Sequence, residues 1–284
     1  MARIAGESPR AARHIKLSPP GVADPVILCC EIFGDGPPIM LVPGLGDTVW
    51  IWRRLIPALQ LRSRVVAVEF RGHGRSTSPA GPYTVEEMAG DLVLLAEKLG
   101  IHRPTVIAQG FGARLALLLE IKKPGFTAGL VLIGAETGPP SGVARDTLGK
   151  MRDHAVKGNM AAAYRARKTR GQEPRGMSSH ERAEHHHLFL RNDPAGYGAS
   201  CAAALDRFNL ADRLVEILCP VLALVGEFDP DRHPDAERFA SLIPGGTATI
   251  IDGTGHCIQL DAPDSFLMVL DTFLRAHGLI ALNP

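Results

Sequence analysis

Thr105-Val106-Ile107-Ala108-Gln109-Gly110-Phe111-Gly112-Ala113-Arg114-Leu115 is the stretch of sequence that decides the fold. It opens with a short, β-branched apolar run, which is typical of a strand buried on both faces of a parallel sheet. From Ala113 onward the pattern becomes helical, and small residues mark the turn between the strand and the helix. The stretch therefore predicts a strand that passes through a tight turn directly into a helix.

This turn has the pattern of a nucleophile elbow, G-x-S-x-G, in which small residues flank the nucleophile because the strand and the helix approach closely. Ala108 and Gly112 are the small flanks here. The centre, where Ser, Cys or Asp would stand, is Gly110, which has no side chain. A covalent acyl-enzyme cannot form on this residue, so the usual serine-hydrolase mechanism is excluded for the sequence as it stands.

The rest of the chain alternates short apolar runs with helical patterns, which predicts a doubly wound, mostly parallel α/β sheet. Besides the strand at residues 105–108, we expect strands at residues 26–33, 39–42, 65–70, 130–133, 221–225 and 247–251. We expect helices at residues 51–59, 84–99, 113–123, 235–242 and 263–277. The first two strands are separated by a Gly- and Pro-rich turn, and we interpret them as a hairpin.

Residues 137–217 break the alternation, because they contain no convincing strand and are rich in Ala, Arg, Lys, His and Glu. We interpret them as a helical cap inserted into a core formed by residues 1–136 and 218–284, with a solvated helical bundle as the alternative. Three consecutive histidines, residues 185–187, would point around a helix without converging on a metal, so we expect them to be solvated.

The charge and cysteine content limit the classes of partner. The 284 residues carry 31 basic and 30 acidic side chains, too balanced for a nucleic-acid or membrane-surface binder. No apolar run approaches transmembrane length, and the N-terminus lacks the apolar stretch of a signal peptide. The five cysteines are scattered without metal-ligand spacing. We therefore expect a cytoplasmic protein with reduced, mostly buried cysteines and no bound metal.

Four more motifs occur along the chain, two before the elbow and two after it. Together with the elbow, they make the chain resemble the α/β-hydrolase superfamily from residue 39 to residue 273. They are VPGLGD (residues 42–47), EFRGHGRS (69–76), GEFDP (226–230) and GTGH (253–256). Pro43 replaces the more usual His of the first motif, and Glu69 replaces the Asp of the second. GPYT (81–84), and NDPAGY (192–197) followed by DR (212–213) and CP (219–220), are most similar to 3-oxoadipate enol-lactonases and related small-ester or carbon-carbon bond hydrolases.

The resemblance implies an α/β-hydrolase fold and a set of site residues around the vacant nucleophile position Gly110. His256 matches the catalytic histidine, and Asp229 matches the acid that holds its tautomer. Asp231 and Glu136 are rival acids. The resemblance also implies an oxyanion hole, whose backbone N–H donors do not depend on side-chain identity. The residues expected for this hole and the surrounding pocket are Leu45, Phe111, Gly44, Asp47 and Gln109.

Cys257 is adjacent to His256, and sequence neighbours usually point apart, so we interpret it as a buried filler and not as a replacement nucleophile.

Three functions fit these residues. In the first, which we favour, His256 and Asp229 act as a base directly on water or on an acidic proton of a small carbonyl, ester or lactone substrate. In the second, the chain is a non-catalytic ligand-binding or interaction protein with a hydrolase fold that no longer catalyses a reaction. In the third, Gly110 is an engineered substitution in an ordinary serine hydrolase. We expect a small-molecule substrate or ligand and no cofactor, and homo-oligomerisation is left open.

Overall fold

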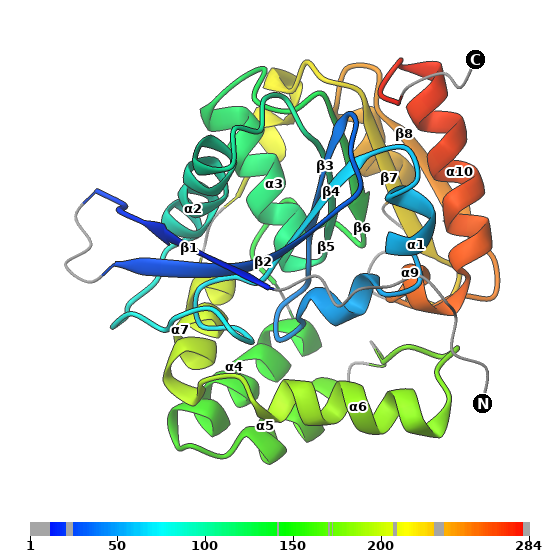
Figure 1. The fold of residues 1–284 in the computed structure, drawn as a ribbon. Coiled ribbons are helices and arrows are strands. Elements are labelled where there is room, and N and C mark those ends of the chain that lie inside the picture. Colours follow the sequence, from blue (N-terminus) through cyan, green and yellow to red (C-terminus); the bar gives the residue numbers. More distant parts are fainter. Residues whose placement is uncertain are drawn as a thin grey trace, which may run out of the picture.

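An eight-stranded sheet forms the centre of the molecule, in the order β1-β2-β4-β3-β5-β6-β7-β8 (Figure 1). The computed structural model describes residues 12–20, 25–140, 142–169, 171, 173–206, 209–229 and 236–280. Strands β3 to β8 run parallel, whereas β1 and β2 are antiparallel to their neighbours. The predicted doubly wound, mostly parallel α/β sheet is confirmed.

All strands except β1 coincide with the expected apolar runs, but the predicted hairpin between residues 26–33 and 39–42 was wrong. The strands are β1 (Arg13–Leu17), β2 (Val26–Phe33), β3 (Pro38–Val42), β4 (Arg64–Val68), β5 (Thr105–Gln109), β6 (Gly129–Ile133), β7 (Val221–Gly226) and β8 (Thr247–Ile251). Instead of forming a hairpin, β2 and β3 lie on opposite sides of β4. The buried residues of β4 thus fill the space between the two strands that the short turn connects.

Helices cover both faces of the sheet (Figure 1). Buried side chains of α2 (Val85–Lys98), α3 (Phe111–Lys122) and α8 (Ala236–Ser241) belong to one core cluster. Those of η1 (Val49–Trp52), α1 (Ile56–Leu59), α9 (Ile258–Asp261) and α10 (Pro263–Ala276) belong to the other. The helix expected at residues 51–59 is therefore split into η1 and α1, with Pro57 within the first turn of α1.

Between β6 and β7 the chain forms a separate group of helices, which lies beyond the ends of the strands at the bottom of Figure 1. We call α4 to α7 the inserted helices. They are α4 (Gly142–Val156), α5 (Met160–Lys168), α6 (Ser179–Leu190) and α7 (Pro194–Leu205), followed by η2 (Ala211–Glu216). Capping boxes fix the start of α6 at Ser178 and, in the core, the predicted start of α2 at Thr84.

The turn between β5 and α3 has the geometry that the elbow pattern requires. Gly110 has φ +52° and ψ −115°, a conformation that residues with a Cβ adopt only under strain. At Gly112 an added Cβ would lie 2.3 Å from the carbonyl oxygen of Pro43 and 2.9 Å from that of Val42. The absence of a side chain at Gly112 therefore lets α3 approach the loop after β3.

We expect Gly112→Ala to lower the free energy of unfolding by about 3 kcal/mol, because both obstructing atoms belong to the backbone and cannot rotate away. Chemical denaturation measures the change. Gly90→Ala is the matched control, since Gly90 lies within α2 and an added Cβ there meets nothing within 4 Å. That control is expected to stabilise the protein by roughly 0.5–1 kcal/mol. Equal effects of the two substitutions would contradict the close approach.

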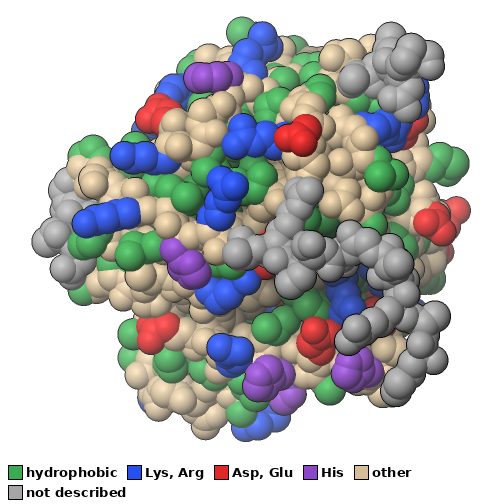
Figure 2. Space-filling view, in the orientation of Figure 1, with side chains coloured by type: hydrophobic (Ala, Val, Ile, Leu, Met, Phe, Trp, Pro, Cys, Tyr) green, Lys and Arg blue, Asp and Glu red, His purple; other side chains and the backbone are tan. Residues whose placement is uncertain are grey.

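The surface carries charges of both signs. Figure 2 shows basic and acidic side chains interspersed among apolar ones on one face, without a large patch of either sign. All five cysteines are buried and unpaired by disulfides, as predicted. Within the described residues, no helix is both long and apolar enough to cross a membrane.

Candidate functional site

Gly110 and His256 face each other at the end of β5. A Cβ built on Gly110 would lie 3.3 Å from Nε2 of His256 and 3.8 Å from Cε1 of the same ring, the nearest atoms among the described residues apart from the neighbouring backbone. A side chain at position 110 would thus point at the imidazole. The sequence motifs, which lie 146 residues apart, are brought together as the elbow pattern predicts.

Asp229 holds the other side of the His256 ring. Its Oδ2 lies 2.7 Å from Nδ1 of His256, and Asp229 and His256 are both buried, 1% and 8% exposed. A carboxylate accepts hydrogen bonds, so Nδ1 is the donor in this contact, and in the neutral imidazole Nε2 is then the acceptor that faces Gly110. The rival acid Asp231 lies outside the described residues. The other rival, Glu136, accepts a hydrogen bond from Nη2 of Arg114 at 2.9 Å.

Gly134, which the sequence analysis missed, makes room for this pair. It follows β6 with φ +55°, and an added Cβ would lie 2.8 Å from Cε1 of His256 and 3.0 Å from Nδ1. The sequence signal that could have indicated Gly134 is its place directly after a buried strand. Its importance could not be recognised because the contact with His256 is made between segments more than a hundred residues apart.

A cavity of about 60 Å³ lies between these residues and the inserted helices. Gly44, Leu45, Asp47, Gly110, Phe111 and His256 line it from the core, together with residues of α4, α5 and α7. Phe111 is the first residue of α3, where backbone N–H groups have no partner within the helix. The loop of Leu45 and the start of α3 therefore border one space beside His256.

Asp47 lines this cavity, but its carboxylate connects the loop after β3 to two of the inserted helices. Nη2 of Arg167 donates to both carboxylate oxygens, at 3.0 and 2.9 Å, and Nε2 of His185 lies 2.9 Å from Oδ1. Burial alone would raise the pKa of Asp47, but the charge of Arg167 and the hydrogen bond with His185 outweigh it and lower the pKa to about 2. The prediction that His185 is solvated was wrong, because it is 3% exposed.

We expect Asp47→Asn to lower the free energy of unfolding by about 3 kcal/mol at pH 7, because it leaves the buried Arg167 without its counter-charge. Because the pKa of Asp47 is lowered, its carboxylate contributes fully to the free energy of unfolding above about pH 4. This contribution is lost as the pH falls toward 2. Denaturant unfolding at several pH values should therefore show a constant difference between variant and unmodified protein from pH 8 to 5, and a smaller one below 4.

Asp153→Asn is the control for this prediction, since Asp153 pairs with Arg152 on the surface with both side chains exposed. Its expected effect is below about 0.5 kcal/mol. A loss for Asp47→Asn as small as that of the control would show that the buried cluster does not stabilise the fold.

Gln109 does not reach the cavity, which corrects its interpretation as a pocket residue. It is fully buried beneath the elbow, where its Nε2 donates to the carbonyl oxygen of His256 at 3.1 Å and its Oε1 accepts from Gln259 at 2.8 Å. Nε2 also lies 3.4 Å from Sγ of Cys257. Burial raises the pKa of Cys257 well above its ordinary value, so this thiol is a buried filler as predicted.

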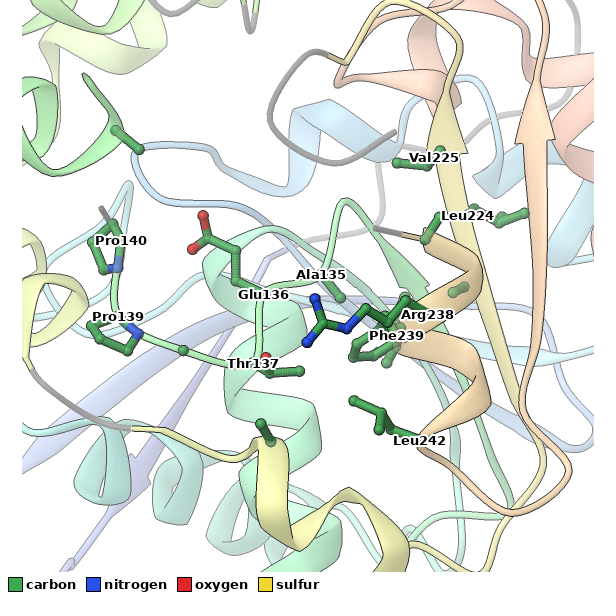
Figure 3. Close-up of a pocket in the computed structure, with 16 residues that line it drawn as sticks. Ala135, Glu136, Thr137, Pro139, Pro140, Leu224, Val225, Arg238, Phe239 and Leu242 are labelled. Carbon is green, nitrogen blue, oxygen red and sulfur yellow. The ribbon is translucent and has the colours of Figure 1, made fainter. Parts of the chain in front are cut away.

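A second and larger cavity, about 370 Å³, adjoins the loop after β6 (Figure 3). Arg238 and Phe239 enter it from α8, Leu242 enters it just after that helix, and Pro139 and Pro140 lie across from them. Glu136 lines both cavities. In the described part of the chain, no group of three or more His, Cys, Asp or Glu side chains could hold a metal ion.

Comparison with known proteins agrees with this architecture. The model of the alpha/beta hydrolase family matches residues 39–268. A protein of Caulobacter sp. named "Putative carbamate hydrolase RutD" is 29% identical over 254 residues, which cover 86% of this chain and 92% of that protein. The 3-oxoadipate enol-lactonase 2 of Acinetobacter baylyi is 26% identical over 258 residues, covering 89% and 95%. The solved structure of a thermophilic esterase from Thermogutta terrifontis superposes with a TM-score of 0.83 at 24% identity, covering 94% and 99%.

Proposed function

This chain belongs to the alpha/beta hydrolase family, and from that premise we propose that it is an enzyme that hydrolyses a small ester, lactone or related carbonyl compound without a covalent intermediate. Its relatives named as hydrolases support an enzyme, and the enol-lactonase among them supports the substrate class. The observation that carries the proposal is the pair His256 and Asp229, retained in hydrogen-bonded contact beside a glycine with elbow geometry.

In the proposed reaction, Nε2 of His256 takes a proton from a water molecule as that water attacks the carbonyl carbon. A cavity of about 60 Å³ has room for water beside the imidazole. The negative charge on the carbonyl oxygen would be stabilised by the N–H groups of Leu45 and Phe111, and Asp229 would stabilise the imidazolium. The proton then passes to the leaving oxygen, so one water and one ester give an acid and an alcohol.

The inserted helices would act as a cap that excludes bulk water from this reaction. Leu148 and Met151 of α4, Arg167 of α5 and Ala204 of α7 line the cavity opposite the elbow. We propose that residues 137–217 form this cap. We also propose that the protein acts in the cytoplasm, because its five free cysteines suit a reducing compartment.

A panel of aryl esters, lactones and diketones tests the proposal. At least one ester or lactone is expected to be turned over, and rapid acid quenching followed by mass spectrometry of the intact protein should show no covalent adduct. An adduct during turnover would refute the direct attack by water. If no compound is turned over while one of them binds, the chain is a non-catalytic binding protein, and the proposed enzyme is refuted.

A further inference from the structure

The two edges of the central sheet differ in how they are protected from other strands. β1 forms one edge, and its sequence Arg-His-Ile-Lys-Leu places basic side chains at the exposed positions. β8 forms the other edge and reads Thr-Ala-Thr-Ile-Ile, without charge. Edge strands of soluble proteins are commonly protected by charged residues, proline or bulges. β8 has no charged residue and no proline, and its register with β7 is continuous, so this edge is open to pairing.

β8 is also exposed along most of its length. β5, β6 and β7 are buried at every position, whereas β8 is buried only at Ile251. Ile250 is 37% exposed. It shares a face of the sheet with Ala248, which packs against the core cluster that includes α8. Among the described strands, β8 pairs with β7 alone (Figure 1).

The pairing with β7 decides which backbone groups of β8 face outward. The N–H of Glu227 donates to the carbonyl oxygen of Ile251 at 3.2 Å, so the backbone groups of Ile251 point toward β7. In a parallel pair every second residue of a strand points to the same neighbour, and Thr249 therefore also points toward β7. The N–H and C=O groups of Ala248 and Ile250 then point away from the sheet, where they can bind another strand.

We propose that β8 pairs antiparallel with β8 of a second copy of this chain, about a two-fold axis at Thr249. Because the backbone groups of Thr249 face β7, the two Thr249 residues form a pair without mutual hydrogen bonds. Ala248 of one copy then exchanges both backbone hydrogen bonds with Ile250 of the other copy, and the symmetry repeats this pair. The result is one continuous sheet through both copies.

The side chains of β8 are complementary to those of β8 itself in this register. The large Ile250 lies opposite the small Ala248, and Thr249 lies opposite Thr249, a favourable cross-strand pair. Any other axis would place residues of the strand opposite the flanking glycine or aspartate. No charged residue occurs between positions 244 and 251, so the two copies bring no like charges together. This match of the strand with itself favours a second copy over an unrelated extended peptide.

The expected oligomer is a dimer that depends on protein concentration. Pairing through one short strand buries much less surface than an obligate dimer interface, so we expect a dissociation constant on the order of 10 µM. Sedimentation equilibrium of the unmodified protein between about 1 and 200 µM measures it. A protein that remains monomeric throughout this range would overturn the proposal and leave an extended segment of another protein as the occupant of the edge.

A lysine at the exposed apolar position of β8 should prevent the pairing. We expect Ile250→Lys to raise the dissociation constant at least about tenfold, because it places a charged side chain in the apolar contact with Ala248. Val156→Lys is the matched control, since Val156 is also β-branched and 69% exposed but lies at the end of α4. It should leave the dissociation constant unchanged. A dimer that is equally stable in a correctly folded Ile250→Lys variant would show that another surface forms it and would refute the proposal.

Cysteine cross-linking tests the position of the two-fold axis and does not depend on the lysine variant. Thr249→Cys should form an intermolecular disulfide under mild oxidation, because the Cα atoms of such a pair lie about 4.5 Å apart. Thr247→Cys is the control, since position 247 is more exposed but its two Cα atoms would lie roughly 14 Å apart. The five native cysteines are buried. Equal cross-linking of the two variants on non-reducing electrophoresis would refute the axis at Thr249.

Discussion

Replacement of Gly110 by serine is expected to raise the turnover of aryl esters by on the order of a thousandfold, because it supplies the attacking hydroxyl that the site lacks. The backbone at position 110 already has the elbow conformation, and an added Cβ would point at Nε2 of His256 from 3.3 Å. The substitution should cost roughly 1–2 kcal/mol of stability, since φ is +52°. Steady-state kinetics with an aryl acetate measures the gain.

Gly110→Ala is the control for this experiment, because it introduces the same backbone strain without a hydroxyl group. An organofluorophosphonate that labels serine nucleophiles should modify the serine variant and leave the alanine variant and the unmodified protein unlabelled at this position. Mass spectrometry locates the label. A serine variant no more active and no better labelled than the alanine variant would show that His256 does not activate a group at position 110.

Removal of the imidazole should abolish the activity of the unmodified protein. We expect His256→Ala to lower kcat/KM by on the order of a thousandfold, the usual contribution of general-base catalysis. Asp229→Asn should cause a loss of similar order, since the Asp229 hydrogen bond fixes the tautomer in which Nε2 is free. Both are measured with the best substrate from the ester and lactone panel.

His187→Ala is the matched control, because His187 is exposed on α6. It should leave kcat/KM unchanged. Full activity in His256→Ala would mean that another group acts as the base. Activity lost in His256→Ala but kept in Asp229→Asn would show that the contact between these two residues is structural.

Strand positions could be predicted well from the sequence, whereas strand neighbours could not. The central strands are nearly pure apolar runs, so β6 (residues 129–133) and β7 (residues 221–226) lie close to where the pattern places them. β1 reads Arg-His-Ile-Lys-Leu and lies at the edge of the sheet, where polar residues are tolerated and the apolar signal disappears. The insertion of β4 between β2 and β3 depends on long-range packing that a short turn does not reveal.

The residues of the candidate site could be located from the sequence where a local pattern marks them. Gly110, Asp229 and His256 each follow a strand in a turn of recognisable composition, and the fold brings these turns together. Arg167 has no such pattern, because it is one of several basic residues in α5 and is selected only by its contact with Asp47. The same holds for His185, which differs from its two histidine neighbours only in the direction that α6 gives it.

The left-handed backbone at Gly110 has an evolutionary consequence. Two of the four glycine codons become serine codons by a single base change, and the strand, the turn and the histidine that such a serine would meet are all in place. One amino-acid substitution at position 110 would therefore supply the residue that the proposed site lacks. We expect such a change to be limited by the stability cost of a side chain at this φ more than by the surroundings of position 110.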